Sequence, residues 1–527
     1  MQKHPNRLWL LALALGWTFD LLFWNKEPGI SFFLFVALTL TAGILFLSQS
    51  GIQAARNTWF LLIPIGFFAV FTFIRLEPLT AFLGHVISLF LMGILAISYQ
   101  SGKWTRYSLA DYVSGFFKLV FSLIAEPLIF QGQASKARSE AETETKRPSA
   151  FWPVVRGLLF AIPVLAFFTG LLASADMVFA QRVEGLVELF SLEKLPEYIF
   201  RMIYISILAY ALAGVFLHAA KQGQDEKLIG VDKPLVPAFL GFTEATIVLG
   251  SVNLLFASFV FIQFQYFFGG LENIRLDGYT YADYARNGFG ELVTVAFFSL
   301  LLFLGLSAIT RREQGNQHQI FSGLGIFLVA LVGVMLVSAF QRLVLYEIAY
   351  GFTRLRTYTH VFIIWLGILL VATIVLELRN RQRAFALAAI VASLGFAASL
   401  TLMNVDGFIV RQNISRHLEG DALDVGYLAS LSHDAIPVLA NLYQSPALDA
   451  ATRDQIGAAL ACFDHQNGFR QSEEPQAWQS FHFSRYQSAR TLAALDLSGY
   501  EFDEDDYSSS VFTPEGDEYN CYSAWED

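Results

Sequence analysis

Long apolar stretches alternate with short polar segments from residue 8 to residue 403. Most are close to 20 residues, and at 1.5 Å rise per residue such a helix crosses the ~30 Å hydrocarbon core of a bilayer. The pattern therefore predicts an all-α protein, a polytopic transmembrane helix bundle of about eleven spans with a small helical C-terminal extramembrane domain. The spans are expected near residues 8–24, 29–48, 58–76, 78–98, 154–174, 201–220, 243–265, 290–309, 320–340, 358–376 and 384–403.

Residues 109–130 are also apolar, but their polar residues recur at steps of three and four and form a stripe on one helix face. These residues are Asp111, Ser114, Gly115, Lys118, Ser122 and Glu126. Such a stripe is typical of a helix that lies in the membrane interface. We therefore predict an interfacial helix here instead of a further crossing.

The changes in composition predict five parts. Residues 1–130 form a four-span membrane part with the interfacial helix, residues 131–149 a disordered cytoplasmic linker, and residues 150–403 a seven-span part. Residues 404–497 follow helical spacing and predict an extramembrane domain, and the acidic residues 498–527 a flexible tail. Asp406, Arg411 and Arg416 are expected to lie on a helix that continues the last span beyond the lipid, which would hold this domain rigidly.

Lysine and arginine are unevenly distributed between the two sets of connecting segments. With the N-terminus in the cytoplasm, the cytoplasmic segments contain about twice as many basic residues as the opposite ones. This bias predicts a multi-pass cell-membrane protein whose N-terminus is cytoplasmic and whose C-terminal domain is external.

Composition agrees with a membrane protein, since 55% of residues are hydrophobic and only 15% are charged. Residues 404–527 contain six arginines, no lysine and about twenty acidic residues, which argues against nucleic acid as a partner. The two cysteines, Cys462 and Cys521, both lie in the predicted external domain. An oxidising environment allows them to form a disulfide, and two unpaired thiols are the alternative.

Charged and aromatic residues are densest at the predicted external boundary. This candidate collar comprises Asp176, Asp283, Arg286, Glu291, Arg342, Glu347, Arg354 and Arg356. Arginine binds carboxylate and phosphate bidentately, so the collar is a candidate site for an anionic ligand. The structural alternative is a set of ion pairs that tie the spans together.

A second set of polar residues falls within the spans themselves. It comprises Asp20, His85, Glu244, Asn253 and Gln263. Ionisable groups at membrane depth are costly and often mark a transport path, which we place near residues 243–265. Interhelical hydrogen bonds that hold the bundle together are the alternative.

Common catalytic patterns such as HExxH, CxxC, GxSxG and Walker A do not occur. The histidines of the C-terminal domain, His417, His433, His465 and His482, lack ligand-like spacing, so neither a metal nor a cofactor is predicted. Enzymatic activity is left undecided, and its absence is favoured.

Several blocks of sequence resemble an uncharacterised family of bacterial multi-spanning membrane proteins, of the domain of unknown function 4173/4153 type. They are GLLASADMVFA (170–180), FIQFQYFFGG (261–270), YADYARNGFGEL (281–292), LYEIAYGFTRLR (345–356), NVDGFIVRQNISR (404–416) and LDVGYLASLSHDAIPVL (423–439). The resemblance covers roughly residues 150–495 and implies a bacterial envelope protein, but it implies no activity and no catalytic residue.

Two functions remain open at this point. One is a transporter or lipid-handling protein with its path near residues 243–265. The other is a non-enzymatic envelope sensor or scaffold that acts through the external domain. The expected partners are the lipid bilayer and an unidentified envelope protein or small molecule.

Overall fold

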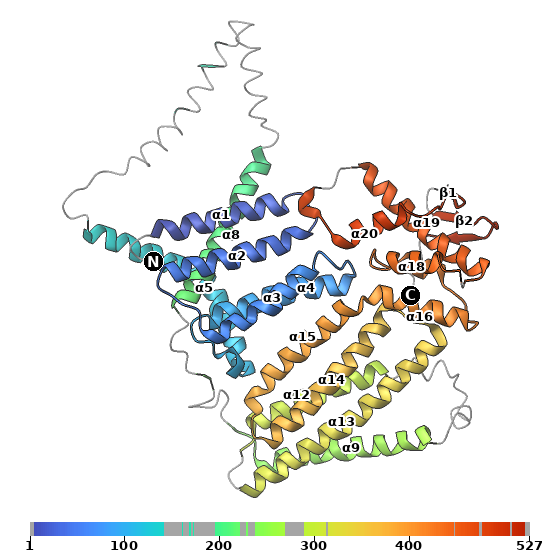
Figure 1. The fold of residues 1–527 in the computed structure, drawn as a ribbon. Helices are drawn as coiled ribbons and strands as arrows, with labels where there is room; N and C mark the ends of the chain where they lie inside the picture. Colours follow the sequence, from blue (N-terminus) through green and yellow to red (C-terminus); the bar gives the residue numbers. More distant parts are fainter. Residues whose placement is uncertain are drawn as a thin grey trace. The chain divides into compact units, whose positions relative to one another are not determined.

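The structure is a computed structural model, and Figure 1 shows its fold. It describes residues 5–141, 161, 168–169, 172, 195–221, 228–229, 238–268, 289–311, 315–446, 448–473, 477–505 and 508–521. The chain divides into two compact units. Unit 1 contains Met1–Trp24, Leu38–Ile52 and Lys118–Lys221, and unit 2 contains Asn25–Ala37, Gln53–Phe117 and Gln222–Asp527.

The membrane part consists of long helices, as the apolar stretches predicted. They are α1 (Pro5–Phe23), α2 (Ile30–Gln49), η1 (Arg56–Leu61), α3 (Leu62–Phe71), α4 (Pro78–Ser98), η2 (Lys103–Arg106), α5 (Leu109–Ala141), α8 (Leu195–Lys221), α9 (Phe242–Phe268), α12 (Phe289–Ile309), α13 (Gly315–Tyr350), α14 (Arg354–Leu378), η4 (Gln382–Ala384) and α15 (Phe385–Met403).

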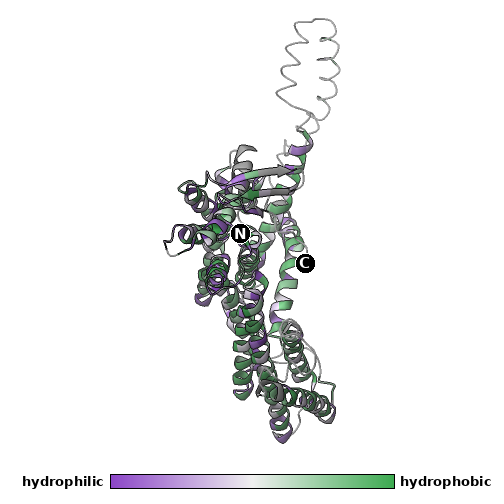
Figure 2. Ribbon diagram, turned by 90° about the vertical axis from the view of Figure 1, so that its right-hand side faces the viewer, coloured by the Kyte–Doolittle hydropathy of each residue, from purple (hydrophilic) through white to green (hydrophobic). Residues whose placement is uncertain are grey.

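Nine helices in the described part of the chain are long and apolar enough to cross a membrane. Hydrophobic residues run along most of the length of these helices (Figure 2). The prediction of an all-α polytopic bundle is therefore confirmed. The expected span at 154–174 lies almost entirely outside the described residues.

In unit 1, α1 and α8 pack along each other around Leu8, Ala12, Ala209 and Ala213. Small residues permit this close approach. At Gly16, for example, an added Cβ would lie 2.9 Å from the carbonyl oxygen of Ile205.

Helix α5 has the predicted polar stripe, and part of the stripe faces α8. Ser122 on α5 lies 2.8 Å from Nδ1 of His218 on α8, and Lys221 on α8 donates a hydrogen bond to Glu126 on α5. Lys118 of the stripe is exposed, and so are apolar residues of the same helix such as Phe121. Because α5 is also among the helices able to cross a membrane, its interfacial position stays a prediction.

In unit 2, α9, α12, α13 and α14 pack side by side around a shared apolar core, and α15 packs on α14 and α4. Gly395 on α15 faces the ring of Trp365 on α14, where an added Cβ would lie 2.0 Å from the ring. Because Gly395 has no side chain, α15 can approach α14 closely at this position.

The C-terminal domain begins with α16 (Val405–Leu418) and continues through α17 (Val425–Ala429), α18 (Ile436–Tyr443), α19 (Ala450–Glu473), η5 (Trp478–Ser480) and α20 (Phe483–Leu492). Its helices surround a core that includes Ile409, Leu439 and Ile456. The expected continuous helix from the last span is broken. Asn404 has φ +54° between α15 and α16, and its side-chain oxygen accepts a hydrogen bond from Gly407 N.

The predicted flexible tail contains a three-stranded antiparallel sheet. Its strands are β1 (Glu501–Asp505), β2 (Ser508–Phe512) and β3 (Glu518–Asn520), in the order β1-β2-β3. Phe502 is paired with Val511, whose side chain is fully buried. The burial of Val511 anchors the sheet to the helical part of the domain. The acidic composition of this segment had instead predicted a flexible tail.

Candidate functional site

A cluster of buried polar residues lies where the C-terminal domain joins α4 and α14 of unit 2. Arg354, the first residue of α14, donates hydrogen bonds of 2.8 and 2.7 Å to the two carboxylate oxygens of Asp406. Asp406 lies in the first turn of α16 and also accepts a hydrogen bond from Ser432 N at 2.7 Å. Its side chain is 0% exposed. Such a buried carboxylate is stable only because arginine and backbone donors satisfy it.

A second carboxylate, Asp434, attaches the loop between α3 and α4 to the same domain. One of its oxygens accepts hydrogen bonds from Leu76 N at 2.8 Å and from Glu77 N at 3.0 Å. Arg75 lies 3.9 Å away, and burial raises the pKa of Asp434 above its ordinary value. Burial disfavours the charged form of Asp434, and the hydrogen bonds from the loop amides stabilise that form.

Glu77 begins α4 and links it to α14. Its oxygens accept hydrogen bonds from Leu79 N at 2.9 Å and from Thr80 N at 2.8 Å, so it caps the helix. The hydroxyl of Tyr358 on α14 also donates to Glu77. The start of α4 is therefore bonded to α14 as well as to the C-terminal domain.

We call this set the junction cluster. Its members are Arg75, Glu77, Arg354, Tyr358, Asp406, Tyr427 and Asp434. Tyr427 belongs to it because its hydroxyl accepts a hydrogen bond of 2.9 Å from Arg354 N, at the start of α14. The acids of the cluster are buried and hydrogen-bonded, so the arrangement fastens helices together and leaves no free carboxylate for acid or base chemistry.

His482 lies beside the cluster and extends the attachment. Its side chain is buried, and Nε2 is 3.1 Å from the carbonyl oxygen of Thr72, just after α3. Burial, with the nearby charge of Arg485, lowers its pKa to about 4. The imidazole is therefore neutral at physiological pH and serves as a hydrogen-bond donor to the loop.

The family described as "Domain of unknown function (DUF4153)" matches residues 62–442, more than half of the chain. The protein belongs to the DUF4153 family. No curated protein and no solved structure matches the chain significantly.

The DUF4153 match confirms the resemblance. The matched residues 62–442 begin before and end before the expected range of residues 150–495. Every member of the junction cluster lies inside the matched range. His482 and both cysteines lie outside it. The attachment between spans and domain therefore lies within the matched region, whereas α19, α20 and the sheet lie outside it.

The predicted collar of this DUF4153 protein is only partly described. Asp176, Asp283 and Arg286 lie outside the described residues, and Glu291 lies in the first turn of α12. The structure brings Arg354 into the junction cluster through Asp406. Sequence reasoning placed Asp406 on a helix beyond the lipid without identifying this pairing.

Two other collar residues of α13 and α14 contact residues outside the collar. Glu347 is buried, 3.0 Å from Nδ1 of His360. Arg356 donates a hydrogen bond of 3.1 Å to the carbonyl oxygen of Tyr350 and lies 4.1 Å from the ring centroid of Tyr346. The charged groups of Glu347 and Arg356 therefore have partners within the protein. Arg342 is partly buried on α13.

The intramembrane residues are mostly engaged as well. Glu244 accepts a hydrogen bond of 2.8 Å from Gly241 N at the start of α9, so it is a helix cap. Asn253 donates to the carbonyl oxygen of Leu324 at 3.0 Å, and Nδ1 of His85 is 2.7 Å from that of Ala81. The amide of Gln263 is buried with no hydrogen-bond partner among the described residues.

Asp20, in unit 1, has a partner that sequence reasoning missed. Arg201 on α8 donates to both carboxylate oxygens of Asp20, with one distance of 2.9 Å, and Tyr204 donates to the same group. Trp24 Nε1 donates to Glu197 at 2.9 Å beside this pair. This arginine–carboxylate pair joins α1 to α8, so Asp20 has a structural role, and its place in a transport path stays a prediction.

Two surface pockets also avoid the predicted polar path. One of 450 Å³ lies between α13 and α14 and is lined by apolar residues such as Val337, Gly367 and Val371. One of 510 Å³ follows α8. Neither is lined by Glu244, Asn253 or Gln263.

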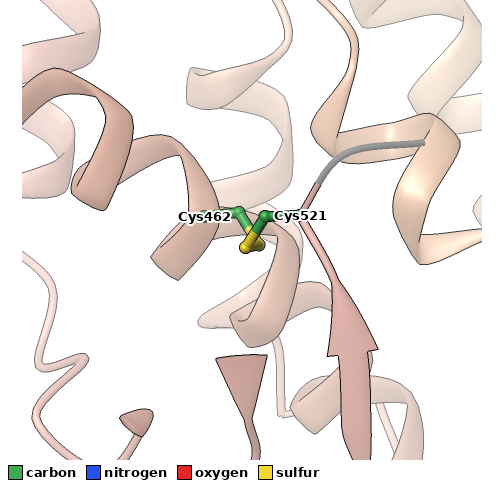
Figure 3. The surroundings of a disulfide bond; sticks show 2 residues. All are labelled: Cys462 and Cys521. Carbon is green, nitrogen blue, oxygen red and sulfur yellow. A yellow bond between two sulfur atoms is a disulfide. The ribbon is translucent and has the colours of Figure 1, made fainter. Parts of the chain in front are cut away.

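Cys462 and Cys521 form a disulfide with a Cα–Cα distance of 5.4 Å. It joins α19 to the end of β3 (Figure 3). In the part of the chain that the structure describes, no group of three His, Cys, Asp or Glu residues could hold a metal ion.

Proposed function

We propose that this multi-pass membrane protein is a platform that holds its C-terminal domain in a fixed position at one membrane face, where the domain engages envelope partners. The junction cluster carries this proposal. Three buried carboxylates, Glu77, Asp406 and Asp434, bond α4, α14 and the loop after α3 to the domain. A domain that only needed a tether would not require such an attachment.

Transport through the predicted path near residues 243–265 receives less support. Glu244 caps a helix and Asn253 bonds to a neighbouring helix, so both have structural roles. A water-filled path would need these groups to line a cavity, and neither described pocket reaches them. The sensor or scaffold alternative is therefore the one that we adopt.

We also propose that the platform lies in the bacterial cell membrane with its C-terminal domain outside. The bias of lysine and arginine toward the opposite set of segments supports this orientation. The disulfide of the C-terminal domain supports it independently, because disulfides persist in oxidising compartments.

The experiment expresses full-length variants in a strain from which the gene has been deleted. Complementation is measured by the lipid composition, the cell-wall precursors and the solute uptake of the strain. Arg354→Ala loosens the domain, whereas Asn253→Leu removes a polar group from the predicted path. The platform proposal expects Arg354→Ala to lose complementation at normal membrane abundance and Asn253→Leu to retain it. Loss with Asn253→Leu and retention with Arg354→Ala would instead indicate transport.

Arg354→Lys is the matched control, because it keeps a charge beside Asp406 but cannot form the two-pronged bond. We expect intermediate complementation from this variant. If Arg354→Ala also lowers membrane abundance, the double variant Arg354→Met with Asp406→Leu replaces the buried charges with apolar side chains of similar size. The platform proposal then expects abundance to recover and complementation to follow it.

A further inference from the structure

Four exposed aromatic side chains are concentrated in nine residues of the C-terminal domain. Their exposed fractions are 60% for Trp478, 38% for Phe481, 43% for Phe483 and 51% for Tyr486. Most side chains between them, including His482 and Ser484, are buried in the domain, and Arg485 is partly buried. The segment thus has one face packed on the protein and one aromatic face directed outward, which is costly in water.

Backbone hydrogen bonds join this segment to the start of α2 and to the residues just after α3. Ile30 N, at the first residue of α2, donates a hydrogen bond of 2.9 Å to the carbonyl oxygen of Phe481. Phe483 N donates at 2.8 Å to that of Phe73, just after α3. Because α2 is one of the helices long and apolar enough to cross a membrane, we expect residues bonded to its first turn to lie near the bilayer surface.

The contact with α2 is also close enough to fix the segment in place. Gly29 faces it, and an added Cβ there would lie 2.6 Å from the carbonyl oxygen of Phe481. Arg485 pairs with Glu27, which precedes α2. These contacts fix the position of the aromatic face relative to the start of α2.

The chemistry of the patch fits the lipid interface. Tryptophan and tyrosine are enriched at headgroup level, where their rings are apolar and their N–H and O–H groups remain hydrated. Arg490 lies 5.8 Å from the ring centroid of Tyr486 on the exposed side of α20. A cation at this position can contact lipid phosphates while the rings enter the acyl boundary.

We propose that Trp478, Phe481, Phe483 and Tyr486 form an aromatic foot that inserts into the headgroup region of the adjacent leaflet. The C-terminal domain then binds the membrane surface directly, in addition to its covalent and hydrogen-bonded attachment to the spans. This proposal does not depend on which face of the membrane carries the domain. It is also separate from the platform proposal, which concerns envelope partners.

The test uses the full-length protein in vesicles of phosphatidylethanolamine and phosphatidylglycerol. Phe483→Cys is labelled with an environment-sensitive fluorophore under non-reducing conditions, so that the native disulfide is retained. Quenching by lipids with a nitroxide near the headgroup is compared with quenching by aqueous iodide. Glu515→Cys, in the exposed turn between β2 and β3, is the matched control.

We expect the label at Phe483 to be quenched several-fold more by the lipid nitroxide than the label at Glu515, and several-fold less by iodide. Equal iodide quenching at the two sites would overturn the proposal. Protection from both quenchers would also overturn it, because a protein surface, such as a second copy of the chain, would then cover the patch.

A second labelling position tests whether the quenching at Phe483 is a local effect of the fluorophore. Tyr486→Cys lies one helical turn from Phe483 and should give the same order of quenching. The variant Trp478→Glu, with the label still at Phe483, is expected to raise iodide quenching because a carboxylate is costly in the acyl boundary. An unchanged ratio in this variant would count against insertion.

Discussion

Arg354 and Asp406 are 52 residues apart in sequence, and the guanidinium of one spans both carboxylate oxygens of the other, at 2.8 and 2.7 Å. The pair joins the first residue of α14 to the first turn of α16. It therefore connects α14 to the C-terminal domain, which begins with α16 directly after the helix break at Asn404. Its strength decides whether the domain is fixed or only tethered.

Replacement of Arg354 by alanine should strongly destabilise this attachment. Asp406 would be left as a buried charge without its arginine, and loss of one partner of a buried pair costs about 3–5 kcal/mol. Hydrogen exchange of the purified protein should increase at the starts of α14 and α16. Arg379→Ala, at an exposed arginine that ends α14, is the control and should change stability by at most about 0.5 kcal/mol.

Asn404 should tolerate glycine better than alanine. Its φ of +54° is a conformation that costs an alanine about 1 kcal/mol or more, and its side chain also caps α16. Asn404→Ala loses both contributions, so a decrease of about 2 kcal/mol in unfolding free energy is expected. Asn404→Gly loses the cap but not the conformational preference, and both variants lose the hydrogen bond of 3.2 Å from Asn404 Nδ2 to the carbonyl oxygen of Asp434. Thermal unfolding in detergent ranks the two variants, and equal melting temperatures would contradict this account.

The disulfide should stabilise the C-terminal domain, because it closes a long loop. Cys462 and Cys521 are separated by 59 residues, for which loop-closure entropy gives about 4 kcal/mol. Alkylation followed by mass spectrometry should detect two free thiols only after reduction. Cys462→Ser with Cys521→Ser should lower the unfolding temperature of the domain to that of the reduced protein. Identical unfolding with and without reductant would show that the bond contributes no stability.

The apolar pattern was enough to predict where most helices lie. The stretches expected at 78–98 and 290–309 correspond to Pro78–Ser98 and Phe289–Ile309. Lipid exposure requires a continuous apolar run, so each span is encoded locally, and Pro78 after Glu77 marks a helix start directly.

The pairing of charges could not be predicted in the same way. Asp20 meets Arg201 across 181 residues, and Asp111 meets Arg383 across 272. Such partners depend on which helices are neighbours, which apolar stretches of similar length do not specify. The sheet was missed for another reason, because its strands are short and rich in serine and acidic residues, and among their described side chains Val511 is the fully buried one.

Acid should weaken the attachment of the C-terminal domain through His482. Burial lowers the pKa of His482 to about 4, below its ordinary value of 6.5. Above pH 6.5 the imidazole is neutral in both the folded and the unfolded protein, so it adds no pH dependence. Between pH 6.5 and pH 4 only the unfolded state takes up the proton, and the folded state loses up to about 3 kcal/mol of relative stability.

His482→Gln isolates this contribution, because the glutamine amide can still donate to Thr72 but does not titrate in this range. The raised pKa of Asp434 acts in the opposite direction, since the folded state takes up that proton first as the pH falls. The measurement is therefore the difference in unfolding free energy between wild type and His482→Gln at a series of pH values. It should be flat above pH 6.5 and should shift against the wild type as the pH falls toward 4, and a difference that is flat throughout would show that His482 titrates normally in the folded protein.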